Sequence, residues 1–241
     1  MTKPEKKYQP FQFKQFAVDH NLCSMKVGVD GTLLGAWADI KNCKKILDVG
    51  TGSGLIALMM AQKNDEAQVH AIEIEENAFK QAQINFDNSP WSNRLNLHLG
   101  DFKNWHPEEK FDLIISNPPY FTASLKSEKE GRNLARHDDA LSLFELLNKA
   151  KELLSNTGKI CLVYPFDGLK SIEEQTKICA LSIKSITLVT PVISKPPKRA
   201  LVEITKETNL EVRVNELSIQ ANGHEFTPEY IQLTKDFYLN F

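Results

Sequence analysis

Residues 45–54 read KILDVGTGSG, a short apolar run that ends in three glycines spaced two positions apart. Such a run is typical of a buried strand, and the apolar spacing of residues 55–63 predicts a helix directly after it. Glycines at a strand-to-helix turn allow a sharp bend and let a ligand approach the main chain. The GxGxG spacing differs from the GxGxxG of dinucleotide folds, and the lysine of a phosphate-binding loop is absent. The turn therefore favours a small-molecule site and argues against a nucleoside triphosphate.

Strand-like and helix-like segments alternate from this turn onward. Besides 45–50, strands are predicted at 68–74, 95–99, 111–116, 160–164, 183–190 and 199–205, and helices at 55–63, 76–87, 141–154 and 169–180. This succession predicts an α/β fold, a doubly wound, mostly parallel sheet with helices on both faces. The last two of these strands follow each other without a helix, which predicts one antiparallel strand at an edge of the sheet. Residues 212–219 are compatible with one more short strand, and Thr227-Pro228 predicts the start of a C-terminal helix.

Composition indicates a globular chain. Its 241 residues are 41% hydrophobic and 25% charged, which suits a single domain over 1–241 with an N-terminal arm, 1–40, and a core, 41–241. None of the four cysteines forms a CxxC pair, so neither a zinc site nor a redox motif is expected. The sequence shows no signal peptide and no apolar run of membrane-spanning length. We therefore expect a cytoplasmic protein with no metal and no membrane partner.

The charge pattern excludes a uniformly basic nucleic-acid binder, because the formal net charge is −2. Any nucleic acid would have to bind a local basic face. Basic residues gather in three groups along the chain: Lys3, Lys6, Lys7 and Lys14; Lys126, Lys129, Arg132 and Arg136; and Lys195, Lys198 and Arg199.

Acidic residues follow the second and third predicted strands. Glu73 ends an otherwise apolar strand, where a carboxylate can accept hydrogen bonds from both ribose hydroxyls of an adenosyl ligand. Glu75, two residues on, is the competing assignment. Asp101 lies just past the third strand and can accept from an adenine amino group, while Phe102 can pack beside the ring.

Asn117-Pro118-Pro119-Tyr120 ends the fourth predicted strand. Two consecutive prolines fix the backbone and leave no amide hydrogen, so the Pro118 carbonyl is held outward as an acceptor. The side-chain carbonyl of Asn117 is a second acceptor beside it. Together they can hold both hydrogens of a planar amino group, and Tyr120 offers an aromatic face to the ring that carries this group.

This arrangement suits methyl transfer to an amide-like nitrogen. The lone pair of such a nitrogen is delocalised, and accepting hydrogen bonds from both N–H groups favours a more pyramidal nitrogen with a freer lone pair. In-line alignment with a methyl donor supplies most of the remaining rate. No strong base is required, because the proton becomes acidic once the nitrogen is alkylated.

The four motifs DVGTGSG, AIEIE, GDF and NPPY, in this order, resemble class I S-adenosyl-L-methionine-dependent methyltransferases that act on nitrogen. The stretches MKVGVDGTLLGAW (25–37) and TPEY (227–230) narrow the resemblance to the bacterial tRNA(Val) adenine-N6 methyltransferases, which modify adenine 37 in the anticodon loop. The resemblance implies a seven-stranded sheet with one antiparallel strand in a Rossmann-like core, with the arm packed on the cofactor side, and binding of S-adenosyl-L-methionine and tRNA. We expect the protein to be a monomer. The implied cofactor-binding residues are Lys26, Asp48, Gly50, Gly52, Gly54, Glu73, Asp101, Phe102 and Asn117. The implied catalytic residues are Asn117, Pro118, Pro119 and Tyr120.

A target adenine must leave its stack to reach such a pocket, which costs less in a loop than in a duplex. The polar, basic tract 121–136 directly follows the NPPY motif, and we expect it to order over RNA. The expected RNA contacts are Lys126, Arg132 and Arg136 in this tract, and Lys198 and Arg199 in the third basic group.

Several alternatives share parts of this pattern. A release-factor glutamine N5-methyltransferase uses the same motif for a planar amide, but usually carries an extra helical N-terminal domain. Ribosomal RNA or DNA adenine-N6 methyltransferases fit the motifs equally well. An oxidoreductase that binds a dinucleotide would show GxGxxG and no NPPY, and a cofactor-binding module without catalysis would not keep an intact NPPY.

Overall fold

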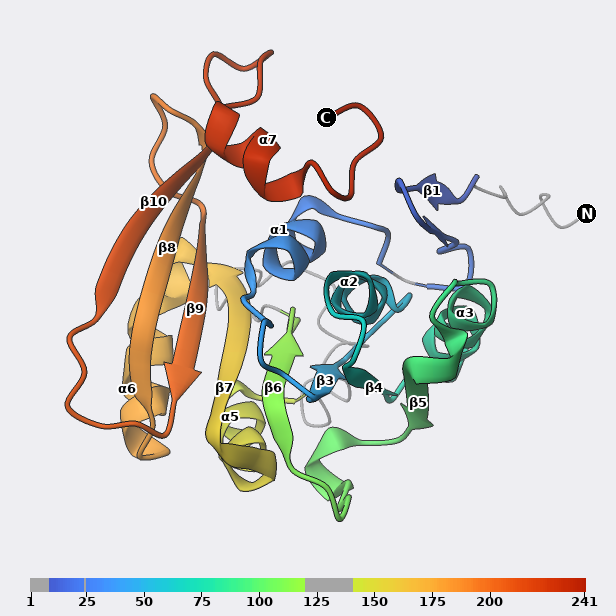
Figure 1. The fold of residues 1–241 in the computed structure, drawn as a ribbon. Helices are drawn as coiled ribbons and strands as arrows, with labels where there is room; N and C mark the ends of the chain where they lie inside the picture. Colours follow the sequence, from blue (N-terminus) through green and yellow to red (C-terminus); the bar gives the residue numbers. More distant parts are fainter. Residues whose placement is uncertain (1–8, 24, 120–140) are drawn as a thin grey trace, which may run out of the picture.

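The computed structural model describes residues 9–23, 25–119 and 141–241. Its centre is a twisted eight-stranded sheet with the strand order β10-β8-β9-β7-β6-β3-β4-β5 (Figure 1). The strands are β3 (Lys45–Val49), β4 (Gln68–Glu73), β5 (Leu95–Leu99), β6 (Phe111–Ser116), β7 (Leu154–Pro165), β8 (Ser182–Val192), β9 (Arg199–Thr205) and β10 (Arg213–Gln220). The short strands β1 (Phe11–Gln12) and β2 (Ala17–Val18) form a separate antiparallel pair.

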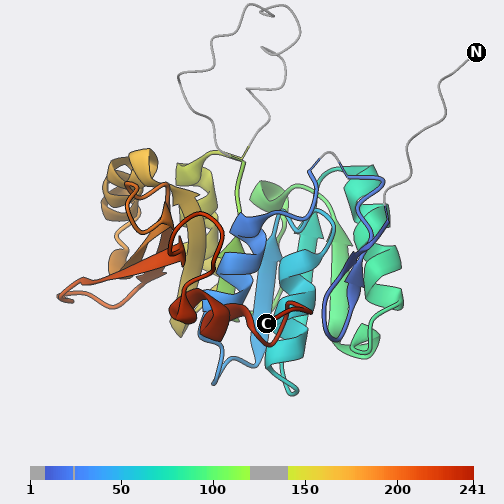
Figure 2. The ribbon, with the colours of Figure 1, turned by 90° about the horizontal axis from the view of Figure 1, so that it is seen from above.

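Helices cover both faces of the sheet. One face packs against α1, α2, α3 and α7, which Figure 2 shows from above, and the other packs against α5 and α6. The helices are α1 (Val29–Trp37), α2 (Leu55–Lys63), α3 (Glu76–Asp87), α5 (Leu143–Leu153), α6 (Leu169–Ile178) and α7 (Pro228–Thr234), with 3-10 turns η1 (Ser92–Arg94), η2 (Phe102–Asn104) and η3 (Phe166–Gly168). The predicted α/β class with helices on both faces is therefore confirmed.

The two sides of the core follow the alternation of side chains along each strand. In β3, Ile46 faces the α2 side, whereas Leu47 and Val49 face the α5 side. All three are essentially inaccessible to solvent. Because β3 is buried on both faces, its apolar residues Ile46, Leu47 and Val49 do not alternate with exposed polar ones, as in other parallel sheets covered on both sides, and the one charged residue among them, Asp48, is itself buried.

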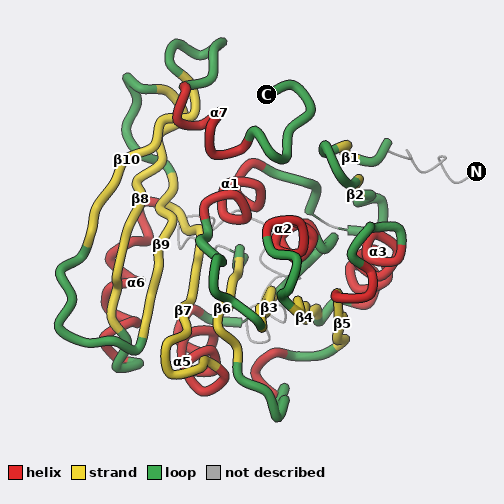
Figure 3. The backbone as a smooth tube through the Cα atoms, viewed as in Figure 1, coloured by secondary structure: helices red, strands yellow, loops and turns green. Residues whose placement is uncertain are grey.

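Two details of the predicted sheet are wrong. The sheet has eight strands rather than seven, because β10 pairs in parallel with β8. The single antiparallel strand, β9, lies between β7 and β8 and not at an edge (Figure 3). The short connection between β8 and β9 does make them antiparallel neighbours. However, β7 also pairs with β9, and the order of strands along the chain does not specify that second partner.

Two terminal features complete the fold. Thr227 caps α7 by accepting a hydrogen bond from the Tyr230 amide at 3.2 Å, and Pro228 is the first residue of the helix, as predicted. The helix α1 precedes the sheet and packs against α2, although its sequence contains two glycines. Within the described ranges, the longest and most apolar helices still fall short of a membrane span.

Candidate functional site

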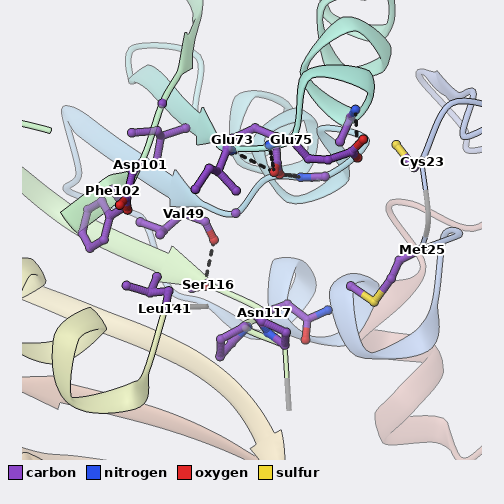
Figure 4. A pocket seen from close by; sticks show the side chains of 18 residues that line it. Cys23, Met25, Val49, Glu73, Glu75, Asp101, Phe102, Ser116, Asn117 and Leu141 are labelled. Atoms are coloured by element: carbon purple, nitrogen blue, oxygen red, sulfur yellow. Dashed lines mark hydrogen bonds between the residues drawn. The ribbon is translucent and has the colours of Figure 1, made fainter. Parts of the chain in front are cut away.

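A cavity of about 360 Å³ opens where β3, β4, β5 and β6 end (Figure 4). Parallel strands bring their carboxyl ends to one edge, so the loops after them meet there. The predicted site residues that line this cavity are Gly50, Gly52, Glu73, Asp101, Phe102, Asn117, Pro118 and Pro119. Residues from four separate segments of the sequence are thus brought together in one place.

The glycine turn presents its bare backbone to the cavity. Gly50 and Gly52 have φ angles of +69° and +58°, which residues with side chains rarely adopt. A Cβ atom added at either glycine would meet no atom within 4 Å, so this side of the turn is open to a ligand. Gly54 differs, because its added Cβ would lie 2.5 Å from the ring of Phe86. Gly54 therefore allows α2 and α3 to pack closely and does not line the cavity.

Asp48 lies beneath the turn and is only 1% exposed. Its Oδ2 accepts hydrogen bonds from the Thr51 hydroxyl at 2.6 Å and from the Ala57 amide at 3.2 Å. Its Oδ1 is buried and has no partner in the described structure. Burial raises the pKa of this carboxyl to about 7, against the opposing effect of the Thr51 hydrogen bond. Asp48 thus holds the turn in shape from below.

Glu73 is fixed by three backbone amides. Its Oε2 accepts from the Gly52 amide at 2.8 Å, and its Oε1 accepts from the Ile74 and Glu75 amides at 2.9 and 3.0 Å. Glu75 also lines the cavity, but its side chain caps α3 by accepting from the Ala78 amide at 3.3 Å. Because Glu73 ties the end of β4 to the glycine turn, its carboxylate is the better placed of the two to meet a ligand on that turn.

Asp101 and Phe102 form the end of the cavity beyond β5. Asp101 caps the turn η2 through a hydrogen bond from the Lys103 amide to its Oδ1 at 2.9 Å. Phe102 is 4% exposed and packs into the α5 side of the core. The apolar side chain of Ile74 also lines this cavity and is 60% exposed. A flat aromatic ligand could therefore lie between apolar walls with carboxylates beside it.

The turn 117–119 lies directly beside the glycine turn. Val49 pairs with Ser116 across β3 and β6, and the Ser116 hydroxyl donates to the Val49 carbonyl at 2.8 Å. Since Gly50 and Asn117 are the next residues of these two strands, they start their turns side by side. Pro118 is buried and Pro119 is exposed. The pairing of two buried strands therefore fixes the separation of the two turns.

A second cavity, of about 430 Å³, lies on the other side of these turns. Gly50, Gly52, Asn117, Pro118 and Pro119 line both cavities. Met25 also lines both, and Figure 4 shows its side chain on the side opposite Asp101. The remaining lining residues come from the loop before α1, the first residues of α1, the glycine turn, the start of α2 and the start of β9. They are Lys26, Val27, Gly28, Val29, Asp30, Gly31, Thr51, Ser53, Leu55, Ile56 and Arg199.

Other predicted site residues have different positions. Lys26 lines only the second cavity, whereas Lys198 is exposed and lines neither. Tyr120, Lys126, Arg132 and Arg136, together with the tract 121–136, fall outside the described residues. Over 9–23, 25–119 and 141–241, His, Cys, Asp and Glu side chains form no group of three that could hold a metal ion.

Nine residues line the first cavity without having been predicted as site residues. They are Cys23, Met25, Val49, Ile72, Ile74, Ala78, Gly100, Ser116 and Leu141. Burial and the nearby carboxylates of Glu73 and Glu75 raise the pKa of the Cys23 thiol to about 12, so this thiol stays protonated. An apolar residue directly after a strand, such as Ile74 after β4, was the available signal in the sequence.

The comparison with protein families agrees with this geometry. The model of the methyltransferase small domain family matches residues 30–172, which is more than half of the chain and includes both turns. The fold and the paired cavities thus belong to a methyltransferase of the small-domain family.

Curated relatives resolve the family further. The chain is 45% identical to the tRNA1(Val) (adenine(37)-N6)-methyltransferase of Parabacteroides distasonis, covering 95% of this chain and 97% of that protein. It is 43% identical to the protein of the same name from Christiangramia forsetii, covering 96% and 98%. The chain belongs to the tRNA1(Val) (adenine(37)-N6)-methyltransferase family. This confirms the family that the stretches 25–37 and 227–230 indicated.

A solved structure supports the fold alone. The crystal structure of a predicted O-methyltransferase from Agrobacterium tumefaciens superimposes with a TM-score of 0.66 at 22% sequence identity. The match covers 86% of this chain and 96% of that chain. The Rossmann-like architecture is therefore shared well beyond the close relatives.

Proposed function

We propose that this chain transfers a methyl group from S-adenosyl-L-methionine to the N6 amine of adenine 37 in tRNA(Val). The observation that carries the proposal is the shared wall: Asn117, Pro118 and Pro119 line both cavities, beside Gly50 and Gly52. A donor in one cavity and an acceptor amine in the other would meet at this wall. The curated relatives, named for this reaction, support the choice of substrate.

The residues of the first cavity fit the cofactor. The open backbone at Gly50 and Gly52 would leave room for the methionine part, and the carboxylate of Glu73, held at the glycine turn by the Gly52 amide, would accept from the ribose hydroxyls. Ile74 and Phe102 offer apolar contacts to the adenine ring, with Asp101 beside them. A cavity of about 360 Å³ falls within the range of small-molecule sites. When bound, the cofactor supplies an electrophilic methyl group on its sulfonium.

The chain's own residues act mainly by orientation. Asn117 and the Pro118 carbonyl accept the two amine hydrogens and hold the nitrogen lone pair toward the first cavity. Pro119 fixes the backbone and adds no competing donor. Tyr120, next along the chain, would stack on the adenine. Such positioning of two reactants is worth several orders of magnitude in rate. No strong base is needed, because the alkylated nitrogen becomes acidic and releases its extra proton.

Further parts of the proposal concern the RNA and the state of the protein. Lys126, Arg132 and Arg136 are proposed to contact RNA from the tract after the NPPY motif, and Lys198 from the loop between β8 and β9. Lys26 is proposed to reach the methionine end of the cofactor across the glycine turn, because it lines the second cavity together with Gly50 and Gly52, which also line the first. We propose one catalytic domain, residues 1–241, acting as a monomer in the cytoplasm, where its tRNA substrate occurs.

The variant Asn117→Ala tests the central role. We expect turnover of an unmodified tRNA(Val) transcript to fall at least a hundredfold, because one of the two amine acceptors is lost. Cofactor affinity by calorimetry should stay within about twofold. Asn96→Ala is the matched control, because Asn96 is exposed on β5 and lines neither cavity. Full turnover by Asn117→Ala would refute the role of this residue.

The substrate is tested separately. Labelled cofactor is incubated with unmodified tRNA(Val), the same transcript carrying guanine at position 37, ribosomal RNA, DNA and a release factor. We expect label only in the first. Transfer to the release factor instead would favour the glutamine N5-methyltransferase alternative, which the two acceptors also suit.

A further inference from the structure

The second cavity carries an ion pair at its end beside β9. The Nε of Arg199 donates to the Oδ2 of Asp30 at 2.7 Å, and both residues line the cavity. Asp30 lies in the first turn of α1, and Arg199 is the first residue of β9. The pair therefore joins the segment before the sheet to the middle of the sheet, in the lining of a cavity that Asn117 also lines.

The direction of β9 explains why an arginine reaches this edge. All other strands of the main sheet end here, whereas antiparallel β9 begins here. Arg199 is in register with Pro165 on β7 and with Val189 on β8. The amide of the preceding residue, Lys198, donates to the Val189 carbonyl at 2.8 Å. The backbone at Arg199 is thus held on both sides, on the same edge as the turn 117–119.

Two hydrogen bonds set the plane of the guanidinium. Besides the Nε bond to Asp30, an Nη atom donates to the Lys198 carbonyl at 3.0 Å. A guanidinium is planar, so fixing two of its nitrogens fixes the direction of the others. Such an oriented fork matches the oxygens of a phosphate, whereas a flexible lysine supplies only a point charge.

Stability alone does not account for the pair. The side chains of Arg199 and Asp30 are 34% and 24% exposed, and ion pairs that water can reach contribute little to folding. Asp30 is the one carboxylate among the residues lining the second cavity in the described part of the chain, where Lys26 and Arg199 are also charged. The lining is thus net positive at the place where we propose that a nucleotide enters.

We propose that Arg199 binds the phosphate of the target nucleotide and that Asp30 is a positioning residue, which orients the guanidinium for this contact. The inference rests on the proposed function. When the adenine occupies the second cavity, its backbone phosphate must stay where the cavity meets solvent, and Arg199 lines this cavity with a third of its side chain exposed. Asp30 also lowers the local positive charge, so that its contribution is orientation rather than attraction.

Salt dependence of tRNA binding tests the role of Arg199. The slope of log Kd against log salt counts the phosphates that the protein neutralises. We expect Arg199→Gln to reduce the magnitude of this slope by about one and to weaken binding roughly tenfold at 0.15 M salt. Lys170→Gln is the matched control. It removes a cation from the exposed Lys170–Glu174 pair on α6, and it should leave the slope unchanged.

Asp30→Asn tests positioning, because it keeps the number of cations. We expect the salt slope to persist while kcat/KM for tRNA falls about tenfold, and we expect no further fall when Asp30→Asn is added to Arg199→Gln. Cofactor affinity should match the wild type in every variant. An unchanged slope in Arg199→Gln, or additive losses in the double variant, would overturn the inference. Failure of the wild type to methylate tRNA(Val) would instead remove the proposed function.

Discussion

At the scale of single residues, Asp48 is a carboxyl group that folding removes almost completely from water. Only one of its carboxylate oxygens has hydrogen-bond donors, and burial raises its pKa to about 7 from an ordinary value of 3.8. The folded state therefore favours the protonated form more than the unfolded chain does. This group's contribution to stability is fully present below pH 3.8 and is lost as the pH rises through 7.

The variant Asp48→Asn should remove that pH dependence. The free energy of unfolding of the wild type should decline between pH 4 and 7 relative to the variant, by at most about 1.4 kcal/mol per pH unit. Denaturant unfolding of both proteins at pH 5 and pH 8 measures the difference. Parallel curves across this range would show that Asp48 stays ionised in the fold.

At the scale of elements, two histidines link neighbouring strands. His70 on β4 and His98 on β5 lie with a ring nitrogen of each 3.2 Å apart, and their planes differ by 2°. His70 also approaches the Glu109 carboxylate at 3.3 Å, and Glu109 in turn pairs with Lys45 at 2.5 Å. A hydrogen bond between two imidazoles needs one nitrogen to accept, so protonation of both rings breaks it.

Acid should therefore loosen this side of the sheet. Burial lowers the pKa of both His70 and His98, so their contribution to stability is present above about pH 6.5 and is lost as the pH falls. We expect His98→Gln, which cannot titrate, to lose less unfolding free energy than the wild type between pH 7.5 and 5.5. Comparing the two proteins cancels the opposite trend from Asp48. An equal loss in both would contradict this account.

The elements also show what the sequence could predict. The bounds of α3, β5, β6 and β9 agree with the predicted segments, because their apolar periodicity is strong and polar residues flank them. The helix α1 was not predicted as an element. Its residues 31–36 are all buried, so it lacks the polar face that reveals a helix, and its two glycines lower its helix propensity.

The sequence also predicted part of the candidate site, but not all of it. Motifs at strand ends identified Gly50, Glu73, Asp101 and Asn117, because parallel strands bring such ends together. The cavity wall formed by Met25 and Arg199 depends on how α1 and β9 pack, and packing of distant segments has no local signal in one sequence. Ser116 is an ordinary strand residue in the sequence. Only the pairing of β3 with β6 shows that its hydroxyl bonds to the Val49 carbonyl and joins the two strands beside the cavity.

At the scale of the whole molecule, the two ends of the described chain are packed together. The Lys14 ammonium donates to the carbonyls of Lys235 and Phe241, each at 2.6 Å, and the Lys14 amide donates to the Phe237 carbonyl at 2.8 Å. Phe13 is 3% exposed and stacks on Tyr238 with ring centres 5.9 Å apart. This aromatic contact closes the α7 side of the core.

Phe13→Ala should destabilise the whole protein and not one loop. Removing a buried phenylalanine costs about 3–5 kcal/mol. We expect a loss in this range by denaturant unfolding, together with faster hydrogen exchange at the Lys14 amide. Phe11→Ala is the control, because Phe11 is 38% exposed, and it should cost much less. Equal effects of the two variants would show that the terminal contact is not part of the cooperative core.

The pairing of Val49 with Ser116 fixes the distance between the glycine turn and the turn 117–119, where the methyl donor and the acceptor amine are proposed to meet. Adjacent strands lie about 4.8 Å apart, and a slip of one residue would move one turn by about 3.3 Å and reverse the faces of its strand. Insertions in the loops around the site should therefore alter which RNA is accepted. One extra residue within β3 or β6 should instead abolish methyl transfer, even if the protein still folds. In this architecture, sequence changes can alter the substrate far more easily than they can alter the distance over which the methyl group is transferred.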